Sequence, residues 1–109
     1  MATTYKVLGQ SNPSATTATT LYTVPSATQA VISTITVCNQ GSTSASYRIA
    51  VRPAGATLAA QHYVAYDIAI AANDTTALTL GIALAATDVV TVYAANTNLS
   101  FSAFGSEIA

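Results

Sequence analysis

Apolar residues alternate with polar or small residues along most of this chain, and this period of two constrains the fold more than any other feature. In residues 47–52, the apolar side chains Tyr47, Ile49 and Val51 occupy alternate positions. A helix repeats its apolar residues about every 3.6 positions, whereas alternate positions lie on one face of a strand. The chain is therefore expected to be built from strands.

The same pattern recurs in short segments separated by turn residues. These segments span residues 5–8, 21–24, 31–38, 47–52, 62–70, 75–80, 88–93 and 99–104. Turn signals such as Pro25 and Asn39-Gln40-Gly41-Ser42 separate them about every ten residues. The sequence therefore predicts an all-β fold, an antiparallel β-sandwich or jelly roll of about eight short strands. The alanine-rich residues 54–61 and 81–87 leave a single helical turn as an alternative, because alanine favours helix.

Three local expectations follow from the alternation. Residues 31–38 and 47–52 flank a strong turn, so we expect them to pair as a hairpin. Within the first of these strands, Val31, Ile35 and Val37 are expected on one face. In residues 62–70 one face is expected to carry the apolar set Val64, Tyr66, Ile68 and Ile70.

The length of 109 residues fits one domain, so residues 1–109 are read as a single β-sandwich. Residues 9–20 are rich in Ser, Thr and Ala and contain Asn12-Pro13, which is typical of a surface loop or arm. We expect residues 1–20 to form a partly extended N-terminal arm and loop. If any segment reaches onto a neighbouring subunit, it is expected to be this one.

The surface of this chain is expected to be poor in charge. Only 6% of its residues are charged, against about a quarter in ordinary soluble domains, while 51% are hydrophobic. A net charge of -1 generates no field that would steer nucleic acid or an anionic membrane, so neither is expected as a partner. No apolar stretch approaches the roughly 18 residues of a membrane span, and Met1 to Lys6 does not resemble a signal peptide. The protein is expected to be made in a cytoplasm and to use its surface for contact with other proteins.

Side chains that carry chemistry are scarce. Cys38 is the single cysteine and His62 the single histidine, so neither an intrachain disulfide nor a conventional structural zinc site is expected. A hydrolytic triad has no supporting motif of the G-x-S-x-G kind. We therefore assign no catalytic residue, no metal and no cofactor, and expect a protein that is not an enzyme.

The few charges suggest contact surfaces. Arg48 and Arg52 should project from the non-core face of one strand, where they are candidates for an intersubunit salt bridge with Glu107, Asp67 or a partner's acidic patch. Solubility and protection of an edge strand explain the same two arginines equally well. Tyr5 near the amino terminus completes the set of interface candidates.

His62, Tyr63 and Tyr66 form the second candidate group. Aromatic faces pack on sugar rings, so this group is a candidate contact for a glycan or receptor. The alternative is that His62 begins a strand and hydrogen-bonds to neighbouring loops.

Several segments resemble small virion proteins of tailed bacteriophages. They read LYTVP at residues 21–25, AVISTITVCN at 30–39, LAATDVVTVY at 84–93 and FGSEI at 104–108. The resemblance is to a β-sandwich module found in head-decoration and in tail or baseplate proteins, and it brings no catalytic residues.

This resemblance implies a structural role in the virion. The expected function is a capsid decoration or cement protein that docks on the head lattice and stabilises neighbouring capsomers. Its expected partners are the major capsid protein or other virion proteins and further copies of itself, with a trimer favoured. The alternative is a tail or baseplate module that binds a host surface glycan or receptor.

Overall fold

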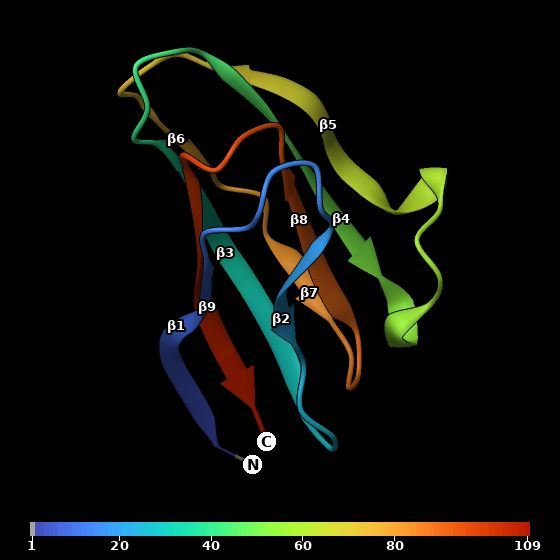
Figure 1. Cartoon of the computed structure of the whole chain (residues 1–109). Helices are drawn as coiled ribbons and strands as arrows, with labels where there is room; N and C mark the ends of the chain where they lie inside the picture. The colour runs from blue at the N-terminus through green and yellow to red at the C-terminus, as the bar shows by residue number, and fades with distance from the viewer. Residues whose placement is uncertain (1) are drawn as a thin grey trace.

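The computed structural model describes residues 2–109 and contains nine strands and two short 3₁₀ turns (Figure 1). Sheet A contains β1 (Thr3–Ser11), β9 (Leu99–Ile108), β3 (Gln29–Asn39) and, both along the far side of β3, β6 (Thr75–Leu78) and β7 (Ile82–Leu84). Sheet B contains, in spatial order, β2 (Thr19–Thr23), β8 (Val89–Ala94), β4 (Ala45–Arg52) and β5 (Tyr63–Ile70). The predicted all-β fold is confirmed. The additional strand, β7, lies in an alanine-rich segment for which a helical turn was the alternative.

The strand pairings are nested. β1 pairs with β9, β2 with β8, β3 with both β6 and β7, and β4 with β5, all antiparallel. Two further pairings, β3 with β9 and β4 with β8, join this long double ribbon into two sheets. A ribbon wound in this way is a jelly roll, so the structure selects that member of the predicted pair. The middle of the ribbon is the β4–β5 connection, which contains the 3₁₀ turns η1 (Pro53–Gly55) and η2 (Ala60–His62).

The core lies between the sheets. Its largest fully buried side chains include Tyr47 and Ile49 from β4, Ile32 and Ile35 from β3, Val90 and Val92 from β8, and Leu99 and Phe101 from β9. The rings of Tyr47 and Phe101 meet edge to face across the two sheets, with centroids 6.1 Å apart. The alternation predicted for residues 99–104 is confirmed, because the buried positions follow a period of two there. In residues 47–52 it holds only for Tyr47 and Ile49: Ala50, expected on the opposite face, is also buried, and Val51 is half-buried against the core.

The predicted hairpin of residues 31–38 and 47–52 is wrong. β3 belongs to sheet A and β4 to sheet B, and residues 40–44 cross from one sheet to the other. The buried Asn39 holds this crossing. Its Nδ2 donates to the carbonyl oxygens of Thr43 (2.9 Å) and Ala71 (3.2 Å), and its Oδ1 accepts from Gly41 N–H (2.9 Å).

A β-bulge overturns the predicted face of β3. The register between β3 and β9 shifts between Ile32 and Thr34, so Ser33 is an extra residue. Val31 is therefore directed outward with 38% of its surface exposed, whereas Ile32, Ile35 and Val37 are buried. Val31 does not share the core face with Ile35 and Val37.

A second irregularity overturns the predicted face of β5. Asp67 has a φ of 51°, and the β4–β5 register shifts beside it. Of the four residues expected on one face, only Ile70 is buried, while Val64, Tyr66 and Ile68 are exposed. The predicted apolar face of residues 62–70 is therefore a largely exposed surface at the edge of sheet B.

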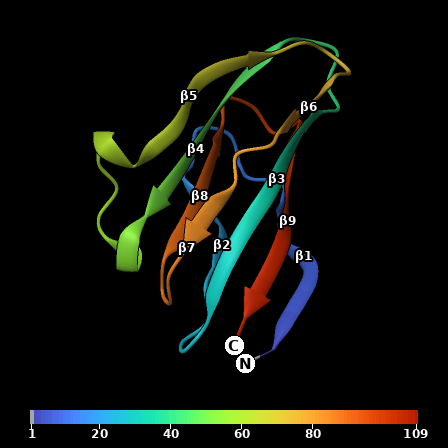
Figure 2. The same cartoon turned by 180° about the vertical axis from the view of Figure 1, so that it is seen from behind.

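The N-terminal segment contains a longer strand than predicted. β1 begins two residues earlier than the expected strand and extends to Ser11, so residues 9–11 are part of it, and the irregular segment before β2 is confined to residues 12–18. Gly9 permits close contact with sheet B, because a Cβ there would lie 2.1 Å from the Leu21 carbonyl oxygen. Ala2 and Ala109, the first and last residues that the structure describes, exchange two backbone hydrogen bonds of 2.8 and 3.0 Å and so lie side by side (Figure 2). That residues 1–20 reach onto a neighbouring subunit stays a prediction.

Candidate functional site

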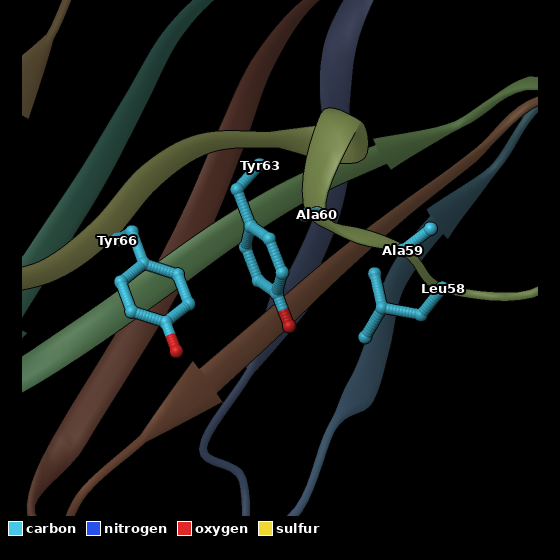
Figure 3. A pocket seen from close by; sticks show the side chains of 5 residues that line it. All are labelled: Leu58, Ala59, Ala60, Tyr63 and Tyr66. Carbon is cyan, nitrogen blue, oxygen red and sulfur yellow. The ribbon is translucent and has the colours of Figure 1, made fainter.

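Tyr63 and Tyr66 come together at the exposed edge of sheet B. Their rings are nearly perpendicular, at 85°, with centroids 4.9 Å apart, and 53% of Tyr66 is exposed. They line a hollow of about 640 Å³, which we call the tyrosine pocket; its lining residues are Leu58, Ala59, Ala60, Tyr63 and Tyr66. Figure 3 shows Leu58 across from Tyr63, with both tyrosine hydroxyl groups pointing to the same side. The structure therefore brings two of the three predicted receptor-contact residues into one site.

His62 has a different position from the two tyrosines and does not line the pocket. Its Nδ1 accepts the backbone N–H of Ala59 at 3.0 Å, which closes the turn η2. This contact matches the alternative interpretation, in which the histidine precedes a strand and hydrogen-bonds to a loop. His62 therefore supports the wall of the pocket that Ala59 and Ala60 provide.

Arg48 lies behind the pocket and is paired within the chain. Its Nε and Nη2 donate to the two carboxylate oxygens of Asp67, at 2.6 and 3.3 Å. Its guanidinium carbon lies 4.2 Å from the ring centroid of Tyr66 and 4.4 Å from that of Tyr93. The hydrogen bond to Asp67 raises the pKa of Arg48 above its already high ordinary value. Asp67, one of the expected intersubunit partners, is thus an intrachain partner, and the ion pair fixes Tyr66 from behind.

Arg52 fixes the loop that forms the other wall. Its Nε donates to the carbonyl oxygen of Ala56 (2.7 Å), Nη2 to that of Gly55 (3.1 Å), and Nη1 to Thr91 Oγ1 (3.3 Å). The N–H of Ala54, on the same loop, donates to Oδ1 of Asp88, the residue before β8, at 2.8 Å. These contacts tie η1 to β8, so the pocket is supported by side chains distant in sequence.

Glu107 is also paired within the chain. Its carboxylate accepts from Lys6 Nζ at 3.0 Å and from the hydroxyl group of Tyr22. The Tyr22 hydrogen bond, followed by the one from Lys6, lowers the pKa of Glu107 below its ordinary value. Burial, with the Glu107 contact added, raises the pKa of Tyr22. An intersubunit salt bridge of Glu107 with Arg48 or Arg52 would have to displace these contacts.

The remaining interface candidate, Tyr5, belongs to a second surface. Tyr5 is 83% exposed on β1 and borders a shallow hollow of about 520 Å³ on sheet A, together with Val7, Val31 and Phe104. We call these four residues the sheet A patch. Tyr5 and Val7 alternate on β1, and the bulge at Ser33 adds Val31 to the same surface, so apolar side chains gather on this outward face beside the polar lining residues Lys6, Ser33 and Ser106.

Sequence reasoning missed the pocket residues Leu58, Ala59 and Ala60 and the ring of Tyr93 beside Arg48. Tyr93 had a detectable signal, because its position in residues 88–93 is out of phase with the apolar Val90 and Val92. The loop residues had none, because they follow residues 54–56, which are held by contacts of Arg52 and Asp88 that no local pattern shows.

The part of the chain that the structure describes, residues 2–109, holds no group of three or more His, Cys, Asp or Glu side chains placed to bind a metal ion. Its helical turns are too short to include any membrane-spanning helix. Comparisons of the chain with protein-family models, with curated proteins and with solved structures gave no match.

Proposed function

We propose that this chain is a non-enzymatic structural subunit of a tailed-bacteriophage virion that decorates the head and stabilises neighbouring capsomers. The observation that carries the proposal is the sheet A patch, an outward apolar surface on a chain with very few charges. The resemblance of the four segments quoted above to virion proteins supports the setting. The jelly roll supports it by analogy alone, since viral capsid proteins and lectins both use this architecture.

The sheet A patch suits contact with protein. Tyr5 and Val7 are 83% and 49% exposed, and removing apolar surface from water is favourable by about 25 cal/mol per Å² before association costs are subtracted. The nearest charges, Lys6 and Glu107, are already paired with each other, so docking would separate few charges from compensating partners. Many copies on a lattice, with trimers favoured, would add weak contacts multivalently.

The test uses heads that lack the protein. Purified wild-type chain should bind at a fixed copy number and raise the temperature at which the heads open. Val31→Asp places a charge at an exposed position of the patch and should weaken binding at least about tenfold, because the carboxylate would be desolvated on docking. Tyr66→Ala, on the other sheet, is the matched control and should bind as the wild type does. Wild-type binding by Val31→Asp, or binding without a gain in heat resistance, would contradict the proposal.

The second candidate function is a tail or baseplate module that binds a host surface glycan or receptor. The specific observation in its favour is the pair of an exposed Tyr66 and a half-buried Tyr63 at the edge of sheet B. Here Tyr66→Ala should reduce adsorption of particles to host cells, and Val31→Asp should leave it unchanged. Electron microscopy of the intact particle, with the subunit labelled, separates the candidates because one places it on the head and the other on the tail.

A further inference from the structure

We infer that the tyrosine pocket binds a neutral saccharide, with the C–H face of a pyranose ring packed in the corner between Tyr63 and Tyr66. This inference deepens the second candidate function by naming a ligand class. Saccharide binding requires no particular location in a virion, so the saccharide inference and the tail or baseplate function can fail separately.

The shape of the pocket matches such a ligand. The two nearly perpendicular rings, with centroids 4.9 Å apart, form a corner, and Leu58, which Figure 3 shows on the other side of Tyr63 from Tyr66, adds an apolar side chain to the lining. The volume of about 640 Å³ falls within the range of about 300–1,000 Å³ found for small-molecule sites. A sugar ring has an apolar face and a rim of hydroxyl groups, and the two tyrosine hydroxyl groups point to the same side, where each can exchange a hydrogen bond with such a rim.

The charges around the pocket favour a neutral ligand. None of its five lining residues is charged. The closest cation, Arg48, is engaged by both carboxylate oxygens of Asp67 and lies between the rings of Tyr66 and Tyr93. An anionic sugar would have to compete with Asp67 for this guanidinium group, so a carboxylate on the ligand should bring no gain.

The pocket is preformed. Arg52 holds the loop carbonyl groups of Gly55 and Ala56, His62 closes the following turn, and the Arg48–Asp67 pair supports Tyr66. Fixed walls reduce the entropy lost when a ligand binds. A groove for an extended proline-rich peptide, another ligand class that packs on surface aromatic rings, would need a row of such rings. Here two rings make a single corner.

The purified full chain should be titrated with a panel of neutral mono- and disaccharides, their uronic acid counterparts, and a proline-rich peptide. The ring signals of Tyr63 and Tyr66 are followed by NMR. We expect at least one neutral saccharide to bind with a Kd in the millimolar range or tighter, and no uronic acid to exceed its neutral counterpart. No saturable shift with any neutral saccharide, more than tenfold preference for the acids, or binding of the peptide alone would overturn the inference.

Variants locate the binding on the pocket. Tyr66→Ala should weaken it at least about tenfold, and Tyr66→Phe should keep it within about threefold because the ring face is retained. Ala60→Arg blocks the pocket without removing a tyrosine and should also abolish binding, which keeps the test valid if Tyr66→Ala disturbs the fold. Tyr5→Ala, an exposed tyrosine on the other sheet, is the matched control. Undiminished binding by Ala60→Arg, or equal losses in Tyr66→Phe and Tyr66→Ala, would contradict ring packing in this pocket.

Discussion

Two buried tyrosines show how the surroundings of a single hydroxyl group decide its contribution. The Tyr22 hydroxyl donates to Glu107, whereas Tyr47 Oη is buried and has no hydrogen-bond partner among residues 2–109. A buried polar group without a partner keeps its desolvation cost, whereas a bond to a charged acceptor offsets it. Burial alone accordingly raises the pKa of Tyr47, because the phenolate would be less solvated still.

Tyr47→Phe is therefore expected to raise the free energy of unfolding by about 1 kcal/mol, since it removes an unpaired hydroxyl and keeps the ring contact with Phe101. Tyr22→Phe is the matched comparison and should lower the free energy of unfolding by about 1–2 kcal/mol, because Glu107 loses a hydrogen-bond donor. Urea denaturation of the three proteins measures both changes. A loss of stability in Tyr47→Phe would show that its hydroxyl group contributes to the fold.

Glu107 predicts a dependence of stability on pH. Its folded-state pKa is lowered, first by Tyr22 and then by Lys6, so its contribution is complete above the unfolded-state pKa of about 4.3 and is lost as the pH falls through the lower folded-state value. The difference in stability between wild type and Glu107→Gln should therefore shrink on acidification from pH 6 toward pH 3. Thermal unfolding of both proteins across this pH range measures the difference. A difference that is constant with pH would exclude this coupling.

At the scale of the elements, the buried face of a strand could be predicted from the sequence where no β-bulge interrupts the strand, and could not where one does. Residues 99–104 were predicted correctly because their alternation is uninterrupted. In β3, adjacent Val31 and Ile32 offer two equally apolar phases, and the bulge at Ser33 decides between them by pairing with β9, a strand about seventy residues away in sequence. The tyrosine pocket was likewise predicted only in part. Its two aromatic residues were candidates from the sequence, but the loop beside them is held by contacts of Arg52 and Asp88 with Ala56 and Ala54.

The connection between β3 and β4 depends on one buried amide. In Asn39→Asp, an oxygen would replace the Nδ2 atom that now donates to the carbonyl oxygens of Thr43 and Ala71. We expect a loss of about 2–4 kcal/mol at pH 7 and a smaller loss near pH 4, where the carboxyl group can be protonated and donate. Denaturation at the two pH values measures this. Asn73→Asp, at an exposed turn of positive φ, is the control and should change stability by less than about 0.5 kcal/mol.

At the scale of the whole molecule, the nested pairing sets the order in which contacts can form. β4 and β5 are joined by ten residues, whereas Thr3 pairs with Ile108, so closing the outer pair requires the longest loop. The hairpin expected between β3 and β4 would have paired strands that are neighbours in the sequence, whereas the fold pairs each of them with strands that are distant in the sequence. A single sequence carries no signal for such pairings, which is why strand content could be predicted and strand order could not.

This order predicts the folding kinetics. Refolding should take milliseconds to seconds, as in other β-sandwiches rich in distant contacts. Ile49→Val in β4 should slow folding, while Phe101→Leu in β9 should mainly accelerate unfolding, because the outer pair closes after the rate-limiting step. Stopped-flow measurements in urea give both rates. A larger effect of Phe101→Leu on the folding rate would reverse the proposed order.

The position of Ala2 beside Ala109 has a practical consequence. Ala2 and Ala109 are bonded to each other as neighbours in a ladder, so a polypeptide attached at both ends would leave the molecule as two parallel-running tethers a strand's width apart. The whole unit can therefore be grafted as a cassette into the tip of a surface hairpin of another protein, and such a host would display the sandwich without having to open its own fold.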